Sequence, residues 1–390
     1  MVDDPVPIAE LRRALVIKLR HHGDVLLSSP VLTVLRNHAP RLDIDALVYA
    51  DTAAMLDQHP ALAELHTIDR DWKKAGGLTQ LRAEWALLQR LRRRDYDLVV
   101  HLTEHPRGAW LVRLLAPRFS VAPRVGGASR FWRRSFTHYF SKPSNARCHT
   151  VERNLDALRR IGVYPKADER RLVLVPGAAA EARVDALLAR HDLAPKSFIH
   201  LHPTSRWLFK CWPEERNAEL IRALLRRGDR VVISAAPDTR EKAMVARILA
   251  QAEGAVDVAG QLSLKEMAAL SARAKLFVGV DSAPMHIAAA MGTPTVALFG
   301  PSGELEWGPW QVPHRLILSG THPCRPCGID GCGGGKRSEC LTTLGVERVL
   351  GAIDDLLHPP LLPTSLPEGE RRLAPPLSRP GGTGDGDEAG

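Results

Sequence analysis

The chain has 390 residues, of which 45% are hydrophobic and 25% are charged, so it can build two apolar cores and is unlike a wholly disordered protein. It contains no uncharged apolar run of about 18 residues, and its first ten residues carry Asp3, Asp4 and Glu10 instead of an export signal; we therefore expect a cytoplasmic protein. The net charge of +9 favours phosphate-rich partners: nucleic acid, an anionic membrane face or a charged small substrate.

Short apolar runs alternate with helical patterns in the first half of the chain. Strands are predicted at 14–19, 44–49 and 98–102, and helices at 25–37, 78–94 and 151–161. This alternation is typical of a parallel sheet. Gly177 and the alanine run that follows it are predicted to connect two domains, 1–175 and 176–358.

The second half repeats the same rhythm. Strands are predicted at 198–202, 230–234, 276–280 and 295–299, and helices from Pro213 to Gly228, at 241–251 and at 284–291. Two Rossmann-like α/β domains in tandem are therefore expected. The tail at 359–390 is rich in proline, glycine and charge, so we expect it to be disordered.

An anion site is predicted where the strand at 276–280 ends. Ser282 can cap a helix that begins at Pro284, and His286 falls in the first turn of that helix. Unpaired backbone N–H groups at a helix start favour a diphosphate, and the side chains of Ser282 and His286 can add hydrogen bonds. The alternative is an ordinary capped helix that carries a histidine.

The strand at 198–202 is followed by a loop with two hydroxyls and two cations, namely Thr204, Ser205, Arg206 and Lys210. Ligands of open α/β sheets bind at such loops. Fixed positive groups stabilise the charge of a leaving diphosphate, so this loop is interpreted as part of a phosphate site. A solvated surface loop is the alternative.

A second set of polar residues follows the first predicted strand: Lys18, Arg20, His21, His22, Gly23 and Asp24. Asp24 occupies a position where it can cap a helix. Alternatively, a carboxylate at the end of a strand and next to Gly23 can act as general base on a sugar hydroxyl. The residues leave both interpretations open.

Two further segments stand out. Residues 130–136 interleave cations with aromatic side chains, a composition that suits sugars, anionic groups, a membrane surface or simply a basic surface. In the loop 324–340 the cysteines Cys324, Cys327, Cys332 and Cys340 either bind a metal ion such as zinc or remain reduced thiols. No nucleic-acid module and no Gly-x-Gly-x-x-Gly fingerprint is present.

With these motifs in view, the chain resembles glycosyltransferase family 9, the ADP-heptose:lipopolysaccharide heptosyltransferases. The resemblance rests on Ala-Leu-Val-Ile-Lys-Leu-Arg-His-His-Gly-Asp-Val-Leu-Leu-Ser-Ser-Pro from Ala14 and on Val-Gly-Val-Asp-Ser-Ala-Pro-Met-His ending at His286. Arg-His-His-Gly-Asp and the Cys-rich stretch look most like the heptosyltransferase III branch. The family implies an α/β GT-B fold, with two Rossmann-like domains whose parallel sheets face each other across a cleft.

The resemblance also implies roles for individual residues. The amino-terminal domain would hold the lipopolysaccharide acceptor and the carboxy-terminal domain ADP-L-glycero-D-manno-heptose, and transfer between them would invert the anomeric centre. Asp24 would be the general base, and Lys210 would steady the departing diphosphate. The expected donor-binding residues are Thr204, Ser205, Asp281, Ser282, Ala283 and His286, with Asp238 or Glu241 at the ribose. The expected acceptor-binding residues are Lys18, Arg20, His22, Gly23, Arg130 and Arg133. No metal ion or other cofactor is expected.

The expected partners are ADP-heptose, a core heptose of lipopolysaccharide and the surface of the inner membrane, contacted peripherally from the cytoplasmic side; no nucleic acid is expected. Two other functions remain open at this point. A sugar-nucleotide 2-epimerase shares the tandem Rossmann-like plan but needs no second sugar. A non-enzymatic glycolipid-binding protein would use the cysteines as a structural metal site, and its binding would not change on loss of Asp24.

Overall fold

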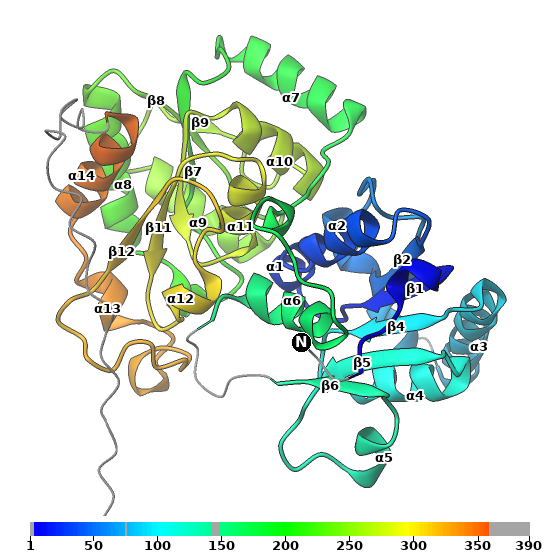
Figure 1. Ribbon diagram of the computed structural model, residues 1–390. Helices are drawn as coiled ribbons and strands as arrows, with labels where there is room; N and C mark the ends of the chain where they lie inside the picture. The colour runs from blue at the N-terminus through cyan, green and yellow to red at the C-terminus, as the bar shows by residue number, and fades with distance from the viewer. Residues whose placement is uncertain (1–3, 75, 142–147, 359–390) are drawn as a thin grey trace, which may run out of the picture.

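The computed structural model describes residues 4–74, 76–141 and 148–358, so the tail predicted to be disordered lies outside the described residues. Figure 1 shows two α/β bodies side by side, the first coloured blue to green and the second green to orange. Each contains a six-stranded, wholly parallel sheet. The predicted pair of Rossmann-like domains is therefore present.

The first sheet has the strand order β3-β2-β1-β4-β5-β6. Its strands are β1 (Arg13–Ile17), β2 (Asp43–Tyr49), β3 (Glu64–Ile68), β4 (Leu98–His101), β5 (Phe119–Pro123) and β6 (His138–Phe140). The α-helices of this part are α1 (His22–Leu26), α2 (Ser29–His38), α3 (Gly77–Arg94), α4 (Pro106–Leu115), α5 (Arg130–Arg133) and α6 (Thr150–Arg160). Short 3₁₀ turns lie at η1 (Ile8–Glu10), η2 (Ala50–Met55), η3 (Arg70–Lys73) and η4 (Asp168–Arg170).

The second sheet has the order β12-β11-β10-β7-β8-β9. Its strands are β7 (Phe198–His202), β8 (Arg230–Ile233), β9 (Val256–Asp257), β10 (Leu276–Val280), β11 (Thr295–Phe299) and β12 (His314–Leu318). The helices are α7 (Ala178–Arg190), α8 (Glu214–Arg226), α9 (Thr239–Leu249), α10 (Leu264–Arg273), α11 (Ala283–Ala290), α12 (Glu304–Trp307), α13 (Glu339–Thr342) and α14 (Val346–Leu357), with 3₁₀ turns η5 (Leu208–Lys210) and η6 (Cys332–Gly334).

Both sheets reverse their strand order at one place, between β1 and β4 in the first and between β7 and β10 in the second. In open parallel sheets, ligands bind outside the carboxyl ends of the strands at such a switch point. The central strands are fully buried from Ala14 to Ile17 and throughout β7, β10 and β11, because helices cover both faces of the sheet. The buried strands therefore hold the loops at their carboxyl ends in fixed positions.

Several local predictions were wrong. The single helix expected at 25–37 is two helices, because Pro30 suits the first turn of a new helix and disfavours helical backbone just before it. The alanine run expected to connect the domains forms α7, in keeping with the high helix propensity of alanine. Strands β3, β5, β6, β9 and β12 and helices α4, α5, α10, α12, α13 and α14 were not predicted. The proposed boundary at 175/176 falls between the last strand of the first sheet and the first strand of the second.

The two domains share an apolar contact. Ile287 and Ala289 of α11 belong to the same buried cluster as Val25 and Leu26 of α1. Polar contacts continue the interface, as Trp310 Nε1 donates to the carbonyl oxygen of Arg170 at 2.7 Å. No helix in the described part of the chain is both long and apolar enough to cross a membrane.

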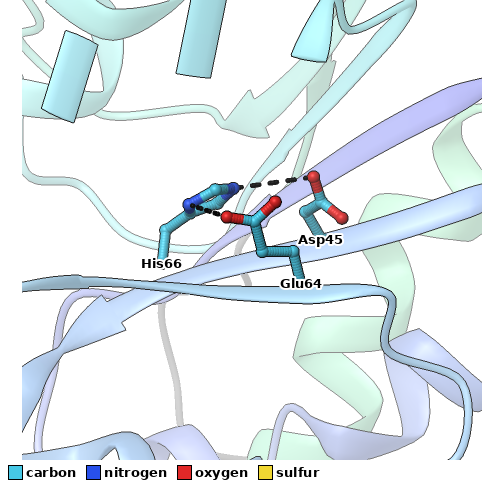
Figure 2. Close-up of side chains that lie close together, drawn as sticks. All are labelled: Asp45, Glu64 and His66. Carbon is cyan, nitrogen blue, oxygen red and sulfur yellow. Dashed lines mark ion pairs between the residues drawn. The ribbon is translucent and has the colours of Figure 1, made fainter. Parts of the chain in front are cut away.

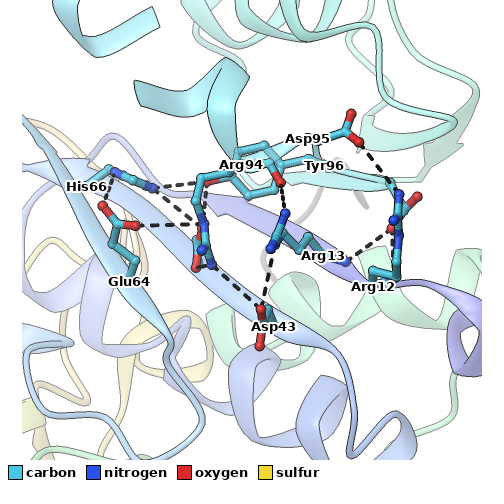
Figure 3. Close-up of polar contacts among 10 residues, drawn as sticks. Arg12, Arg13, Asp43, Glu64, His66, Arg94, Asp95 and Tyr96 are labelled. Carbon is cyan, nitrogen blue, oxygen red and sulfur yellow. Dashed lines mark hydrogen bonds and ion pairs between the residues drawn. The ribbon is translucent and has the colours of Figure 1, made fainter. Parts of the chain in front are cut away.

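One cluster in the first domain, of two buried residues and a partly exposed glutamate, has the residue types of a metal site. Asp45, Glu64 and His66 place one ligand atom each within 4.8 Å of one another (Figure 2), the one such group of three or more His, Cys, Asp or Glu side chains in the described residues. However, Arg94 donates to both carboxylate oxygens of Asp45, at 2.7 and 2.9 Å, and the Tyr96 hydroxyl donates to Oδ2 at 2.7 Å. Figure 3 shows that Arg94 also forms ion pairs with Asp43 and Glu64. The guanidinium therefore occupies the place a cation would take.

We expect Asp45→Ala to lower the free energy of unfolding by about 3 kcal/mol, because it leaves the Arg94 guanidinium without its buried partner. Burial tends to raise the pKa of Asp45, but hydrogen bonds from its neighbours prevail and lower that pKa from 3.8 to about 2. The ion pair therefore contributes fully above pH 3.8, and its contribution is lost as the pH falls towards 2. Urea unfolding at neutral pH measures the difference.

The matched control is Asp43→Ala. Asp43 lies on the same strand and also approaches Arg94, at 4.0 Å, but its side chain is 49% exposed. Exposed ion pairs contribute about 0–1 kcal/mol. Equal losses of stability in the two variants would contradict the assignment of Asp45 as the buried anchor of this network.

Candidate functional site

The predicted site residues follow the strands that flank the two switch points. Asp24 lies in α1, after β1 of the first sheet. Lys210 ends η5, after β7, and Asp281 directly follows β10 in the second sheet. The structure thus brings the predicted catalytic and donor-binding segments to the carboxyl edges of the two sheets.

Lys210 and Asp281 form an ion pair, in which Nζ donates to Oδ2 at 2.6 Å. The Asp281 side chain is 7% exposed and that of Lys210 is 22% exposed. The carboxylate therefore holds the ammonium group at the junction of the loops that follow β7 and β10. The sequence predicted both residues for this site but not their contact.

His286 connects the two domains. It lies in the first turn of α11 and is buried, and a Cβ atom added to Gly23 would be only 2.9 Å from its Cδ2 atom. Any side chain at Gly23 would therefore press on the imidazole ring, which explains the glycine at this position. The loop that carries Asp24 consequently packs directly on the start of α11.

The imidazole of His286 is held neutral. Burial lowers its pKa to about 4, although the nearby carboxylates of Asp281 and Asp24 oppose this effect, and the charge of Lys210 reinforces it. Within the described residues, the buried Nδ1 atom has no hydrogen-bond partner. The segment that carries Asp24 and the start of α11, which belong to different domains, therefore meet at a neutral imidazole whose Nδ1 atom has no partner among the described residues.

Asp24 does not cap α1. The N-cap is His21, and Asp24 lies within the first turn, 17% exposed, with Oδ1 4.0 Å from Nε of Arg20. The capping alternative is therefore wrong. Burial lowers the pKa of His21, and the cations Arg70, Arg206 and Arg20 lower it further while Asp24 opposes them.

Arg70 was missed by the sequence analysis. It lies in η3, beyond β3, and its Nη2 atom donates to the carbonyl oxygen of Arg20 at 3.0 Å. Its Nε atom pairs with Asp51 at 3.2 Å. Because β3 was not predicted, no sequence signal placed Arg70 at this edge of the sheet.

Thr204 and Glu241 bind each other. The Thr204 hydroxyl donates to Glu241 Oε2 at 2.6 Å, and both residues are buried. Asp238 instead caps α9, with Oδ1 accepting from the backbone N–H of Arg240 and of Glu241. Glu241 thus fixes the loop after β7, while Asp238 is half-exposed at the start of α9.

A buried chain of side chains leads to Thr204. Ser234 Oγ lies 2.7 Å from His200 Nε2 and 2.9 Å from His202 Nδ1, and His202 Nε2 lies 3.3 Å from Thr204 Oγ1. Burial lowers the pKa of both histidines to about 3, so they serve as neutral hydrogen-bonding groups. The strand end that carries Thr204 is therefore rigidly supported.

The two serines of the predicted phosphate site also have assigned contacts. Ser205 Oγ accepts from the N–H of Trp207 at 3.3 Å. Ser282 is the N-cap of α11 by position, but its hydroxyl donates to the carbonyl oxygen of Val280 and does not accept from the helix. The predicted side-chain cap is therefore wrong. Ala283 begins α11, and its Cα lies 3.9 Å from the position that a Cβ of Gly23 would take.

The predicted acceptor-binding residues do not form one group. Lys18 is buried, and its ammonium donates to Asn154 Oδ1 at 3.0 Å, so it ties β1 to α6 and has a structural role in place of the expected acceptor contact. His22 Nε2 lies 2.8 Å from the carbonyl oxygen of Asp51. Arg130 and Arg133 are exposed on α5, which Figure 1 shows beyond β6 and away from α1. Arg20 and Gly23 remain beside Asp24.

A pocket of about 340 Å³ opens beside Lys210, and part of the Cys-rich loop borders it. Its lining consists of Phe209, Lys210, Pro301, Ser302, Gly303, Glu306, Trp307, Pro326, Cys327 and Gly328. Arg325 anchors the loop, since its Nε atom donates to the carbonyl oxygen of Gly300 at 2.6 Å. The sequence analysis gave this loop no place at the site.

The cysteines of this loop do not lie at metal-binding distance from one another. No three of their sulfur atoms fall within 4.8 Å among the described residues. Burial raises the pKa of Cys340, which Arg325 opposes, and the other three cysteines add to the rise.

Comparison with known proteins places this chain in a family. The model of glycosyltransferase family 9 (heptosyltransferase) matches residues 84–335, more than half of the chain. Lipopolysaccharide heptosyltransferase 3 of Escherichia coli is 33% identical over 352 residues, which cover 89% of this chain and 100% of that protein. Lipopolysaccharide heptosyltransferase 1 of Pseudomonas aeruginosa is 30% identical over 373 residues, with 89% and 99% covered.

Solved structures agree on the fold. A glycosyl transferase family 9 protein from Veillonella parvula superposes with a TM-score of 0.77 at 23% identity, over 90% of this chain and 99% of that one. The structure of the Escherichia coli ADP-heptose lipopolysaccharide heptosyltransferase II gives a TM-score of 0.69 at 22% identity, over 88% and 98%. The fold is therefore GT-B, and the chain belongs to glycosyltransferase family 9, the heptosyltransferase family.

Proposed function

We propose that this protein transfers L-glycero-D-manno-heptose from ADP-heptose to a core heptose of lipopolysaccharide, with inversion at the anomeric carbon. The observation that carries the proposal is the contact between the two domains at the start of α11. Gly23, next to Asp24, packs on the ring of His286 in α11, and Lys210 is paired at 2.6 Å with Asp281, which lies just before that helix. A base on one side and a cation on the other is the arrangement that a displacement between acceptor and donor requires.

The carboxy-terminal half supplies the groups that suit a nucleoside diphosphate. The backbone N–H groups at the start of α11 are free of the Ser282 hydroxyl, and helix starts favour phosphate. Lys210 lies next to this helix through its ion pair with Asp281. We therefore assign the diphosphate to the space between Lys210 and α11, and the sugar to the adjoining pocket lined by Glu306 and Trp307.

The amino-terminal half supplies the base and cations for an anionic acceptor. In the proposed reaction, the acceptor hydroxyl oxygen attacks the anomeric carbon, its proton passes to the Asp24 carboxylate, and the bond from that carbon to the diphosphate oxygen breaks with ADP taking the electron pair. The charge that develops on ADP is met by Lys210. Arg20 and Arg70 lie together, since Arg70 Nη2 donates to the carbonyl oxygen of Arg20 at 3.0 Å, and both suit phosphate or carboxylate groups of the acceptor.

The acceptor in this proposal is a glycolipid, so we further propose that the protein works at the cytoplasmic face of the inner membrane as a peripheral protein. The 33% identity to heptosyltransferase 3 of Escherichia coli over its whole length supports the heptosyltransferase III branch of the family. We propose accordingly that the heptose is added as a side branch to the second core heptose.

The test is ADP release from ADP-heptose by the full chain, with and without lipopolysaccharide core extract from heptose-deficient cells. We expect release that depends on the acceptor and a core that gains the mass of one heptose. If none of the core extracts, whatever their truncation, supported ADP release, the heptosyltransferase proposal would be overturned. An epimer of the donor formed without acceptor would identify the 2-epimerase instead.

A further inference from the structure

Large apolar side chains are exposed together on two helices of the amino-terminal domain. Half of the ten exposed large hydrophobic residues within the described part of the chain lie on α3 and α4. They are Leu78 (76% exposed), Leu81 (65%), Trp85 (56%), Trp110 (57%) and Leu114 (41%). Soluble proteins rarely expose so many large apolar groups side by side unless the surface binds a partner.

These side chains border a groove between α3 and α4, which Figure 1 shows side by side at the outer edge of the domain. The groove has a volume of about 510 Å³ and is lined by Leu81, Glu84, Trp85, Leu88, Arg107, Trp110, Leu111 and Leu114. Glu84 and Arg107 form an ion pair with each other, so the groove itself carries little net charge. Apolar contact therefore dominates inside it.

The apolar surface continues onto α5. The rings of Trp110 and Phe131 are 4.5 Å apart, and the guanidinium of Arg113 lies 4.8 Å from the centre of the Phe131 ring. The basic and aromatic segment noted in the sequence is thus attached to the groove and not to the residues around Asp24. We call the surface formed by α3, α4 and Phe131 the tryptophan face.

The segment that carries the tryptophan face is rich in positive charge. Residues 77–134 contain twelve arginines and no lysine, against four aspartates and glutamates. This excess of eight positive charges is nearly the whole net charge of +9 that the chain carries. Exposed members include Arg82, Arg90 and Arg93 on α3 and Arg113 on α4. A surface of this kind complements an anionic one.

The tryptophan face begins at the same edge of the first sheet as the candidate site. α4 begins at Pro106, five residues after the end of β4, and α3 begins at Gly77, shortly after η3 with Arg70. Helices that follow parallel strands begin at the carboxyl edge of the sheet. The groove therefore starts at the edge that carries Arg20, Asp24 and Arg70.

We propose that the tryptophan face docks on an anionic phospholipid bilayer, with Trp85 and Trp110 in the interfacial layer and the arginines on lipid phosphates. Tryptophan prefers the headgroup region, where its ring is buried and its N–H remains wet. Basic residues add about 1 kcal/mol each near an anionic membrane surface. Docking in this orientation leaves the edge with Asp24 next to the membrane, where a glycolipid acceptor would lie. The biological role of docking therefore rests on the proposed function, whereas vesicle binding can be measured independently of it.

A second copy of the chain fits the face less well. Pairing two tryptophan faces would bring two arginine-rich rims together, and like charges across an interface oppose association. The lipid surface instead supplies the opposite charge. We therefore take self-association as an outcome that would overturn the proposal.

The test is flotation of the full chain with vesicles of phosphatidylethanolamine and phosphatidylglycerol, compared with vesicles of phosphatidylcholine. We expect binding only to the anionic vesicles, weakened by added salt. The double variant Trp85→Ser/Trp110→Ser should bind about tenfold more weakly, since it loses both interfacial rings. The matched control is Tyr164→Ser/Leu305→Ser, which removes two side chains of 51% and 65% exposure elsewhere and should bind as the wild type does.

Thermal unfolding and ADP binding check that each variant is folded, and transfer to delipidated, water-soluble core measures the chemistry separately. Suppose that both double variants transfer heptose normally and bind vesicles equally well. That result would overturn the docking surface and leave the proposed function intact. A wild-type dimer that the tryptophan variant abolishes, with no vesicle binding, would assign the face to a second copy. If the wild-type chain bound vesicles but transferred no heptose, the proposed function would be contradicted and the docking surface would stand.

Discussion

We expect Asp24→Asn to lower the rate of heptose transfer by on the order of 10³-fold while ADP binding is retained, because a positioned general base typically contributes 10²–10⁴-fold. Asparagine has nearly the same shape as aspartate but cannot accept the proton of the acceptor hydroxyl. Asp24 is 17% exposed and does not cap α1, so its replacement leaves the helix start unchanged. Steady-state transfer and calorimetric ADP binding measure the two effects.

The control is Asp95→Asn, an aspartate of the same domain that follows α3 and whose exposed carboxylate pairs with Arg12 at 3.6 Å. We expect this variant to transfer heptose at the wild-type rate, since Asp95 lies on the amino side of β4, away from the edge that carries Asp24. The loss should appear in kcat and not in the KM for ADP-heptose. Full activity of Asp24→Asn, or a loss explained by weaker donor binding, would remove Asp24 from the role of base.

We expect Lys210→Met to lower transfer by about 10²–10³-fold, the usual effect of removing a group that stabilises developing negative charge. The variant has a second consequence. Lys210 donates to Asp281 at 2.6 Å, so its removal leaves a carboxylate facing the space assigned to the diphosphate. Repulsion between that carboxylate and the phosphates should also raise the KM for ADP-heptose.

The double variant Lys210→Met/Asp281→Asn distinguishes these effects. It removes the repelling carboxylate, so donor affinity should partly recover while the rate of transfer stays low. Lys275→Met is the matched control, because Lys275 makes a similar ion pair with Asp229, at 2.5 Å, on the amino side of β10. Equal losses of transfer in Lys210→Met and Lys275→Met would show that only the stability of the domain is involved.

Periodicity and composition were sufficient to predict two tandem α/β domains with parallel sheets and to place the candidate site segments at the ends of strands. The central strands are uninterrupted apolar runs, because a parallel sheet covered on both faces must bury every side chain. The polar residues after these runs could therefore be assigned to the ligand edge before the structure was known. Local patterns failed where two signals compete, as in α7, where a run of alanines after Gly177 suggested a connection but formed a helix.

The amino-acid sequence by itself determined the two Rossmann-like domains and the residue types at the ends of β1, β7 and β10. Only the tertiary structure decided which of those residues meet: Gly23 against His286, Lys210 with Asp281, and Lys18 withdrawn into the interior. It also decided that Trp85 and Trp110, far apart in sequence, share one exposed groove. The reason is physical: burial pattern is encoded locally along each strand or helix, whereas contacts between loops depend on how complete sheets and helices pack.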